Sequence, residues 1–539
     1  MTRGRPICLF RVDASVRIGT GHVHRCLALA SALAARGMAC HFVHRLHDGH
    51  MADVIRQRGY TVHTLPAPAR ATSIADGDYR AWAGATEADD AVSTSTIATT
   101  LGASMLVLDH YGYGREWERH LRGAVQSLMV IDDLANREHD CDLLLDQNYF
   151  ADGAARYEGL VPAACRRLCG PQYALLAPEY ANARPSRHPR QGPVQRVLVF
   201  FGGSDLADHT SQTLHVLNEA AFRHLAVDVV VGPGYAAFDA LAAAASAHGH
   251  VTVHRGLPSL LPLMTAADVA IGAGGISVWE RCCVGLPAIV TAIAQNQHAP
   301  AQALSAAGAC ILLPDASDAT RHSAAWQAAL RETLHALIDH PSRLAELADA
   351  AWQMGEGRGT GLAAEMLCPS THDTMQLRAA RPDDCRLYWR WVNDPDVRLA
   401  SLEQSPVDWA AHRRWFTRRL HADASRLWVF ETPDGAPVGQ FRVDVVGGHG
   451  HVDFSVDRIF RGRGLGTALV RAGSLAWSAD HPGIPLTAVV RQTNPASASV
   501  FRASGLFDEG TSPSDDMRVG YTFALRTAAA PRPVASCSP

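Results

Sequence analysis

One short stretch near the N-terminus combines glycines with a histidine in a pattern that could do chemistry. Gly19, Gly21 and His22 form this stretch. They follow an apolar run, Ile7 to Val12, that predicts a strand, and they precede a segment with helical periodicity. Glycines there let the backbone approach a ligand, and the N–H groups of a helix start favour negative charge. A histidine at a helix start tends to stay neutral and could act as a general base.

Two other interpretations of this stretch remain open. A lone histidine in a loop is often a solvated or helix-capping residue. Gly-x-Gly after a strand also suggests a dinucleotide site, but His24 occupies the place of the third glycine, so that fingerprint fails.

A second polar group follows another predicted strand. Ser104 to Asp109 is a continuous apolar run of the kind a buried parallel strand shows, and it leads into His110 and Tyr111. Strands and helices alternate through this part of the chain, which predicts a doubly wound α/β domain. Ligands of such domains bind beyond the carboxyl ends of the strands. Because both loops lie at such ends, we expect them to converge on one cleft.

A polar, proline-rich linker at 182–195 precedes a second alternating pattern with glycine-rich turns. Amides at the helix starts after these turns could bind a diphosphate, and Glu280 could accept hydrogen bonds from ribose. We expect Ser277 to cap its helix. The alternative is that the glycines only make tight turns and that Glu280 only complements the helix dipole. The candidate nucleotide-sugar contacts are Gly202, Gly203, Ser204, Gly274, Gly275, Ser277, Glu280 and Gln295 to His298.

A third glycine-rich loop, 461–466, lies in the last third of the chain, after a junction at 367–375. It falls between a predicted strand and a predicted helix. Arg-x-x-Gly-x-Gly in that place lets backbone amides wrap a pyrophosphate. A chance glycine-rich turn is the alternative.

Length and composition exclude several classes of protein. The 539 residues predict roughly three or four domains. The net charge of −4 does not favour nucleic acid or an anionic membrane as a partner. No apolar run has the length of a membrane span, the start lacks a signal-peptide pattern, and the 12 cysteines form no CxxC pair. We therefore expect a reduced, cytoplasmic protein. Histidines recur at 41, 44, 47 and 50, but Gly49 and a strand-like pattern argue against a helical metal site, so no metal is expected.

Taken together, these motifs resemble the UDP-sugar hydrolase family of pseudaminic acid biosynthesis, over roughly residues 5–365. The family acts on UDP-2,4-diacetamido-2,4,6-trideoxy-β-L-altropyranose, releasing UDP and free sugar by attack of water at the anomeric carbon. It has the two-domain, MurG-like fold known as GT-B. The motifs that carry the resemblance are Arg11-x-Asp13-x-Ser15, Ile18-Gly19-x-Gly21-His22, Asp109-His110-Tyr111, Phe201-Gly202-Gly203-Ser204-Asp205, Gly274-Gly275-x-Ser277-x-Trp279-Glu280 and Asn296-Gln297.

The resemblance implies a role for each matching residue. His22 matches the catalytic histidine that orients or deprotonates the attacking water. Glu280 matches the ribose-binding carboxylate. The implied catalytic group is His22, Tyr111, Asn296 and Asp13; the sugar-binding group is Gly21, Asp109, His110 and Gln297; the UDP-binding group is Gly202, Gly203, Ser204, Gly274, Gly275, Ser277 and Glu280.

The last third, roughly 375–525, resembles the GNAT N-acetyltransferases. The pattern of Trp391-x-Asn393-Asp394-Pro395, His412 and Trp415-Phe416 looks most like the acetyltransferase of the same sugar pathway. Phe501 departs from the family, because many GNAT enzymes carry there a tyrosine that protonates the departing thiolate. The implied acetyl-CoA contacts are Arg461, Gly462, Arg463, Gly464, Gly466 and Asn494.

The sequence therefore predicts a fused bifunctional enzyme with two Rossmann-like domains followed by an α+β GNAT domain. The expected parts are 1–185, with the sugar and catalytic loop; 190–366, which binds UDP; 375–526, the acetyltransferase; and a tail, 527–539. The expected partners are a UDP-linked amino sugar and acetyl-CoA, a co-substrate. Two alternatives stay open: a MurG-like glycosyltransferase, and a non-catalytic nucleotide-sugar-binding unit attached to an acetyltransferase.

Overall fold

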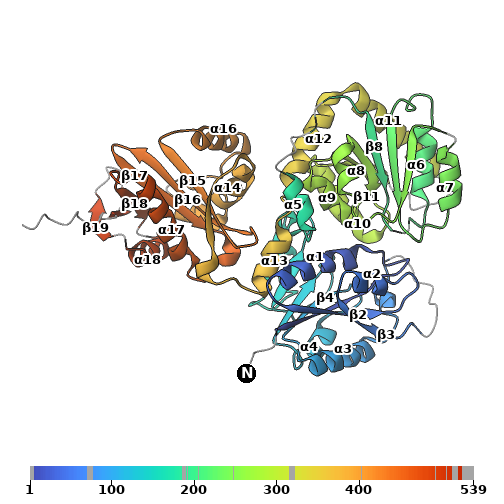
Figure 1. Cartoon of the computed structure of the whole chain (residues 1–539), viewed down its shortest axis with the longest axis horizontal. Helices are drawn as coiled ribbons and strands as arrows, with labels where there is room; N and C mark the ends of the chain where they lie inside the picture. The colour runs from blue at the N-terminus through green and yellow to red at the C-terminus, as the bar shows by residue number, and fades with distance from the viewer. Residues whose placement is uncertain are drawn as a thin grey trace, which may run out of the picture. The chain divides into compact units, whose positions relative to one another are not determined.

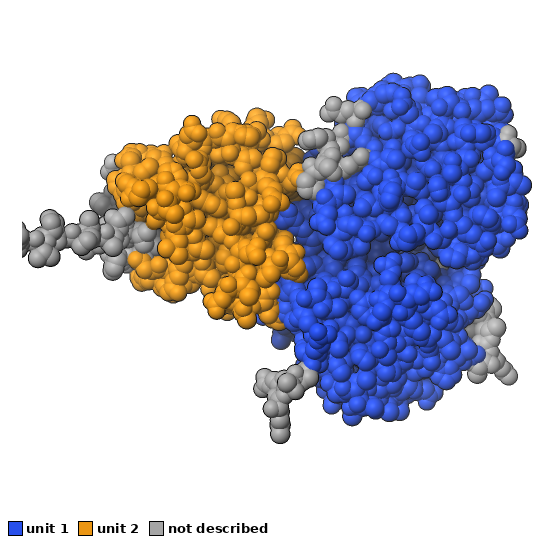
Figure 2. Space-filling view, viewed as in Figure 1, with its two compact units in different colours: residues 1–368 blue, residues 369–539 orange. Residues whose placement is uncertain are grey.

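The computed structural model describes residues 5–68, 77–184, 190, 192–203, 205–246, 248–314, 322–401, 403–491, 493–505, 507–512 and 520–524. The chain divides into two compact units, 1–368 and 369–539, drawn in different colours in Figure 2. The first unit contains two sheets and the second unit contains one.

The first sheet of unit 1 is entirely parallel and has the strand order β3-β2-β1-β4-β5-β6-β7. Its strands are β1 (Ile7–Val12), β2 (Ala39–Arg45), β3 (Thr61–Leu65), β4 (Met105–Asp109), β5 (Ser127–Ile131), β6 (Leu143–Asp146) and β7 (Arg166–Cys169). The order reverses between β1 and β4. In a doubly wound sheet this reversal opens a crevice for a ligand.

Helices cover both faces of this sheet. In Figure 1, α1 (Gly21–Ala35) and α2 (Ala52–Gln57) lie on one face, and α3 (Glu87–Leu101) and α4 (Arg115–Leu121) lie on the other. Helix α1 buries Val23, Cys26 and Leu29, as its apolar periodicity predicts. Helix α3 was missed, because its sequence is rich in threonine and serine and has little apolar contrast. Residues that cap helices nevertheless mark both of its ends. Thr86 accepts a hydrogen bond from Asp89 N, and Gly102 ends the helix with φ +63°.

The second sheet of unit 1 repeats the design, with the order β10-β9-β8-β11-β12-β13 and parallel pairing throughout. Its strands are β8 (Arg196–Phe200), β9 (Ala226–Val231), β10 (Val251–Arg255), β11 (Val269–Ala273), β12 (Ala288–Thr291) and β13 (Ile311–Leu312). Its helices are α6 (His209–Leu217), α7 (Phe238–Ser246), α8 (Leu261–Ala266), α9 (Ser277–Cys283), α10 (Gln295–Ala306), α11 (His322–Asp339) and α12 (Pro341–Met354). Two apolar clusters, one with Trp326 of α11 and one with Trp279 of α9, form the core.

The chain passes between the two halves of unit 1 more than once. After α5 (Pro178–Ala183), Arg184 donates to the carbonyls of Cys283 (3.0 Å) and Trp352 (2.7 Å). The last helix of unit 1 in the sequence, α13 (Gly359–Leu367), packs against α1. Arg36, directly after α1, forms an ion pair with Glu365 at 2.5 Å. The N-terminal half therefore includes the last helix of the unit.

Unit 2 is built on one mixed sheet of order β14-β15-β16-β17-β18-β20-β19. Its strands are β14 (Gln376–Ala379), β15 (Ser425–Glu431), β16 (Pro437–Val446), β17 (His449–Val456), β18 (Leu486–Arg491), β19 (Phe507–Ser512) and β20 (Gly520–Ala524). Its helices are α14 (Cys385–Val392), α15 (Pro395–Ala400), α16 (Trp409–Leu420), α17 (Leu465–Asp480) and α18 (Pro495–Ala503). All pairs are antiparallel except β17 with β18.

The predicted fold class is confirmed: two doubly wound parallel sheets are followed by an α+β unit. Two local expectations about the nucleotide turns are wrong. Ser277 is the first residue of α9 and does not cap it, because Ile276 holds the cap position without a side-chain hydrogen bond. The turn at Gly202 does not open directly into a helix, because α6 begins only at His209. Along the part of the chain that the structure describes, no helix combines the length and apolarity needed to span a membrane.

Candidate functional site

The candidate site of unit 1 lies at the strand-order reversals of its two sheets. The loop after β1 carries Asp13 and leads to His22 at the start of α1, and β4 ends at Asp109. In the second sheet, the loops after β8 and β11 carry Gly203 and Gly274. The fold thus places these four loops at the carboxyl ends of the central strands β1, β4, β8 and β11.

The start of α1 lies against both glycine loops of the second half. A Cβ added at Gly21 would lie 3.4 Å from Ile276 Cγ2, in the loop before α9. A Cβ added at Gly203 would lie 3.1 Å from Thr20 Oγ1. His22, the next residue, is therefore brought beside the loops that are the candidates for holding a nucleotide.

His22 and Asp109 form a hydrogen-bonded pair. The His22 Nδ1 atom lies 2.6 Å from Asp109 Oδ1. Burial alone would raise the pKa of Asp109, but Arg25 and His22 hold it well below its usual value. An ionised carboxylate only accepts hydrogen bonds, so in this short contact Nδ1 is the donor and Nε2 is the ring nitrogen that remains for water or a substrate. Arg25 Nη2 also lies near Nδ1, at the longer distance of 3.2 Å. The His22 side chain is 10% exposed and the Asp109 side chain is fully buried, so only the histidine of the pair reaches the surface.

Arg25 connects this pair to a second carboxylate. It lies one turn beyond His22 on α1 and donates to both oxygens of Asp109 at 2.7 Å and to Asp133 Oδ2 at 2.7 Å. Its side chain is 4% exposed. Two ion pairs on one buried guanidinium fix the orientation of both carboxylates. The sequence reasoning missed Arg25; its spacing of three residues from His22 on one helix face was the available signal.

Tyr111 belongs to the same network through Asp133. Its hydroxyl donates to Asp133, and its ring meets the His22 ring edge-on with centroids 4.7 Å apart. Burial, together with Asp133, raises the pKa of Tyr111. Tyr79 and Trp82 complete an aromatic wall around Tyr111, with centroids 5.3 and 5.4 Å away. These two residues follow no predicted strand, so the strand-end rule could not find them.

Asp13 and His110 lie in a buried layer. Asp13 Oδ1 accepts from Arg45 N at 2.7 Å and pairs with Arg11 at 2.7 Å, while Oδ2 faces His110 Nε2 at 3.6 Å. His110 Nδ1 accepts from Gly112 N, and burial lowers the pKa of His110 to about 3. Asp13 and His110 are 1% and 2% exposed. This environment suits residues that hold a loop in place more than residues that touch a substrate.

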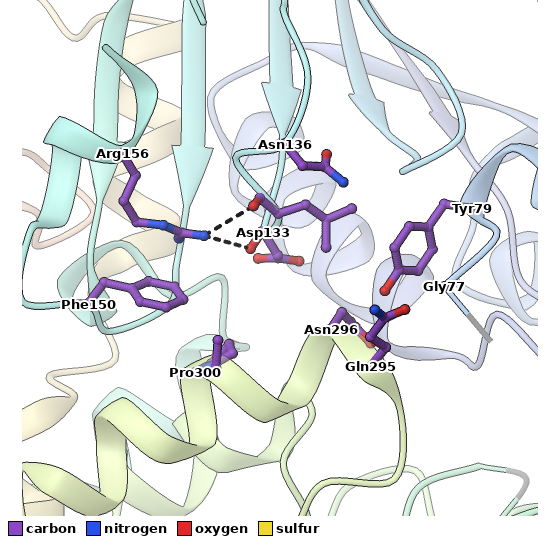
Figure 3. Close-up of a pocket in the computed structure, with 11 residues that line it drawn as sticks. Gly77, Tyr79, Asp133, Asn136, Phe150, Arg156, Gln295, Asn296 and Pro300 are labelled. Carbon is purple, nitrogen blue, oxygen red and sulfur yellow. Dashed lines mark hydrogen bonds between the residues drawn. The ribbon is translucent and has the colours of Figure 1, made fainter.

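A cavity of about 250 Å³, with polar and apolar lining in similar amounts, lies between the two halves of unit 1. Figure 3 shows Arg156 donating to the carbonyls of Asp133 and Leu134, at 3.4 and 3.3 Å, while its guanidinium stacks on Phe150 at 3.5 Å. Opposite them, Asn296 and Gln295 project from the start of α10. The lining residues are Gly77, Tyr79, Asp133, Leu134, Asn136, Phe150, Arg156, Gln295, Asn296, Ala299 and Pro300. The cavity thus shares Asp133 and Tyr79 with the surroundings of His22.

The remaining predicted nucleotide contacts occupy the second half. The first amides of α6 are already capped by Asp205, which accepts from His209 N and Thr210 N; Ser204 lies outside the described residues. Gln297 Oε1 accepts from Ile293 N at 3.1 Å, and its side chain packs against Gly274 and Gly275. In the turn before α9, Val278 N and Trp279 N donate to the carbonyls of Gly275 and Ile276 at 3.0 Å. The amides of 275–277 are therefore the better candidates for binding a diphosphate.

Glu280 lies on the first turn of α9, as expected. Burial raises its pKa to about 7, and a hydrogen bond with Tyr180 of α5 opposes this shift. A carboxyl group that is neutral near physiological pH can donate as well as accept a hydrogen bond.

The candidate site of unit 2 lies where β17 and β18 diverge. These parallel strands pair only at Gly450–Leu486 and His451–Thr487, so beyond these pairs their backbone groups are open to a ligand. The loop that follows β17 has Gly462 and Gly464 at φ +77° and +75° and opens into α17. Left-handed glycines before a helix start give the cradle of amides that a pyrophosphate requires.

Several side chains of this loop have structural partners. Arg461 pairs with Asp394 (2.9 Å) and Asp396 (2.8 Å), so its guanidinium holds the loop against α15. Asn494 caps α18 by accepting from Ser497 N at 3.1 Å. The remaining predicted members of this group are placed as follows: Arg463 lies over the Phe460 ring, and Gly466 lies beside Val500.

Comparison with known proteins defines the class of each part. Residues 197–358 match the glycosyltransferase family 28 C-terminal domain, and residues 374–506 match the acetyltransferase (GNAT) domain. The chain thus joins a region similar to the glycosyltransferase family 28 C-terminal domain to a region similar to the GNAT acetyltransferase domain.

Curated relatives are distant. The chain is 28% identical over 207 residues to the UDP-2,4-diacetamido-2,4,6-trideoxy-β-L-altropyranose hydrolase of Campylobacter jejuni, covering 38% of this chain and 63% of that protein. It is 27% identical over 153 residues to the spore coat polysaccharide biosynthesis protein SpsG of Bacillus subtilis, covering 27% and 45%. The chain therefore spans less than two thirds of the length of either relative.

Solved structures give likenesses of low identity. MurG of Acinetobacter baumannii is 15% identical with a TM-score of 0.45, covering 67% of this chain and 99% of that one. The spermidine N-acetyltransferase of Vibrio cholerae, in complex with CoA and spermine, is 16% identical with a TM-score of 0.25, covering 28% and 94%.

Proposed function

We propose that the chain is a bifunctional enzyme of nucleotide-sugar metabolism. Unit 1 hydrolyses a UDP-diacetamido-trideoxyhexose to UDP and free sugar. Unit 2 transfers an acetyl group from acetyl-CoA to the 4-amino group of the preceding UDP-amino sugar, in pseudaminic (nonulosonic) acid biosynthesis. The distant similarity to the Campylobacter jejuni hydrolase and the GNAT match support this pairing of activities.

The observation that carries the hydrolase proposal is the His22–Asp109 pair beside the two glycine loops. With Nδ1 donating to Asp109, Nε2 is the atom that takes a proton from water. The water oxygen bonds to the anomeric carbon as the bond from that carbon to the phosphate oxygen breaks, and the electron pair leaves with UDP. The backbone amides of 275–277, at the start of α9, stabilise the negative charge on the departing diphosphate. Water supplies the hydroxyl group, so no other reactant is required.

In this proposal Tyr111, Asn296 and Gln297 shape the sugar site, and Asp13 and His110 support it. Asn296 lines the cavity and presents an amide to it. The cavity volume of about 250 Å³ and its mixed polar and apolar lining suit a sugar ring with amide substituents. Glu280, on the first turn of α9, would bind the ribose.

For unit 2, the residues present fit acetyl-CoA. The diverging strands β17 and β18 expose backbone groups that suit the amides of its pantetheine arm, and Gly462 to Gly466 suit its pyrophosphate. When bound, acetyl-CoA supplies the activated acetyl group. Phe501 is 3% exposed and carries no acidic proton, so the proton for the departing thiolate comes from another group or from water.

The test uses the full chain with the UDP-4-amino sugar and acetyl-CoA, followed by mass spectrometry. We expect acetylated UDP-sugar first, then free sugar and UDP, with no acceptor alcohol added. UDP release only in the presence of an added acceptor would show that unit 1 is a glycosyltransferase. No UDP release at all would show that unit 1 is a non-catalytic nucleotide-sugar-binding unit.

The matched variants are His22→Gln and His24→Gln. Since His22 supplies the base, His22→Gln is expected to reduce UDP release by about 100- to 10,000-fold while UDP still binds. His24 is exposed two residues further along α1, so His24→Gln is expected to turn over normally. Near-normal turnover of His22→Gln would refute the proposed role.

A further inference from the structure

Two cysteines of unit 1 bring their thiols into contact. The Sγ atoms of Cys141 and Cys165 lie 3.6 Å apart. Both are free thiols in the structure, 1% and 8% exposed. The 12 cysteines form no CxxC pair, so sequence spacing did not indicate this contact.

The fold explains why these thiols meet. Cys165 directly precedes β7, and Cys141 lies two residues before the first residue of the neighbouring parallel strand β6. The first pair of these strands is Leu143 with Arg166, so Cys141 lies one residue out of register with Cys165. Neighbouring strands lie about 4.8 Å apart, within the range of backbone separations that a disulfide spans. Rotating the two side chains would bring the sulfur atoms from contact to the bond length of about 2.05 Å.

The surroundings distinguish the two thiols. The hydrogen bond with Cys141 lowers the pKa of Cys165; burial and Asp142 oppose this shift, and Arg167 and His139 add to it. The pKa of Cys141 is raised. Cys165 is also the more exposed of the pair. It is therefore the thiol that an oxidant reaches first as a thiolate.

The residues between the two cysteines include part of the cavity wall. Phe150 and Arg156 line the cavity, and Asn148 donates to Asp133 at 2.8 Å. Asp146 pairs with Arg156 at 2.5 Å. A covalent bond between Cys141 and Cys165 would close a ring around this segment.

We propose that Cys141 and Cys165 form an oxidisable dithiol, and that a peroxide converts them into a disulfide that tethers the 142–164 wall of the cavity. The Cys165 thiolate attacks a peroxide oxygen, giving a sulfenic acid and, with hydrogen peroxide, one water after protonation. The Cys141 sulfur then attacks the sulfenic sulfur, its proton leaves with the hydroxyl group as a second water, and the S–S bond forms. Two thiols and one hydrogen peroxide thus give one disulfide and two waters.

The experiment treats the reduced full chain with hydrogen peroxide, alkylates the remaining thiols under denaturing conditions and digests the protein with trypsin. Because the chain contains no lysine, cleavage occurs after arginine and puts Cys141 on peptide 138–156 and Cys165 on peptide 157–166. We expect these peptides joined, about 2 Da lighter than their reduced sum, and separated again by dithiothreitol. Cys165→Ser must abolish the joined peptide.

A second measurement reports on the segment itself. Amide hydrogen exchange of residues 142–164 is expected to slow on oxidation in the native chain and to be unchanged in Cys165→Ser, because only the native chain can close the ring. The half-exposed Cys385 of unit 2 serves as the control for oxidant delivery. Cys141 and Cys165 recovered as separate alkylated peptides while Cys385 is oxidised would overturn the proposal. Neither readout depends on hydrolysis, so the outcome is independent of the proposed function.

Discussion

The proposed hydrolytic chemistry depends on a single imidazole whose orientation is fixed by buried charge. His22 is held by Asp109, Asp109 is held by Arg25, and Arg25 extends to Asp133 and so to Tyr111. A chain of paired charges in a low-dielectric interior is rigid, because breaking any link leaves an uncompensated ion. The outward nitrogen of His22 is thus preorganised before a substrate arrives.

Arg25→Lys tests this link. Lysine keeps the charge but cannot contact Asp109 and Asp133 together in a fixed geometry. We expect the kcat of UDP release to fall by roughly 10- to 100-fold with little change in KM, because His22 becomes misoriented while the substrate contacts remain. Steady-state kinetics on the UDP-sugar measures both constants. A raised KM with an unchanged kcat would instead make Arg25 a substrate contact.

Glu280 makes the stability of unit 1 depend on pH. Its folded pKa is about 7 and its ordinary value is 4.5. Between these values the unfolded chain has lost the proton and the folded chain keeps it, so stability falls as pH rises from 4.5 to 7 and stays lower above 7.

Glu280→Gln removes this dependence. We expect the variant to be more stable than the native chain by about 3 kcal/mol at pH 8, and the difference to vanish near pH 4. Urea unfolding of both proteins at the two pH values measures it. If the two proteins differed in unfolding free energy by the same amount at pH 8 and pH 4, the substitution would act through packing and not through the proton on Glu280.

At the scale of elements, the sequence was most informative where a strand was apolar and continuous. The predicted strand at 7–12 is confirmed at both ends, and the one predicted at 104–109 begins one residue later, at Met105. Their carboxyl ends located His22 and Asp109, because ligand loops of parallel sheets follow those ends. The pairing partners Arg25, Asp133 and Trp82 were not predicted. They depend on how separate loops fold onto one another, and local periodicity carries no information about that.

Helix α13 provides a test at the element scale. It begins at Gly359, where an added Cβ would lie 2.5 Å from the backbone nitrogen of Ala174. Gly359→Ala is therefore expected to destabilise unit 1 by about 1–3 kcal/mol through overpacking, measured by urea unfolding. Gly123→Ala is the control, since an added Cβ there meets nothing within 4 Å. Equal stability of the two variants would show that α13 can shift without cost.

At the scale of the whole molecule, two compact units carry the two proposed activities. Their candidate sites use different loops, in 1–368 and in 369–539. Every substrate contact that we propose for one reaction lies within one unit. The two reactions should therefore be separable by mutation.

Gly462→Trp and His22→Gln test this separation in full-length chains. Gly462 has φ +77°, a conformation that tryptophan adopts only with strain, so Gly462→Trp would distort the loop that we assign to acetyl-CoA. We expect Gly462→Trp to lose acetyl transfer while UDP release from the acetylated sugar continues, and His22→Gln to show the reverse. Thiol release and UDP release are followed in parallel, and loss of both activities in either variant would contradict independent sites.

The return of α13 to the first half affects how this chain could exchange parts with its relatives. The ion pair between Arg36 and Glu365, and the hydrogen bond from Thr360 to the Leu176 carbonyl (2.6 Å), join residues far apart in sequence. A recombination event that replaced everything after residue 190 would exchange α13 along with the second half of unit 1 and leave α1 facing a foreign helix. Functional chimaeras should therefore be those that carry two crossover points and keep 359–367 with its own N-terminal half.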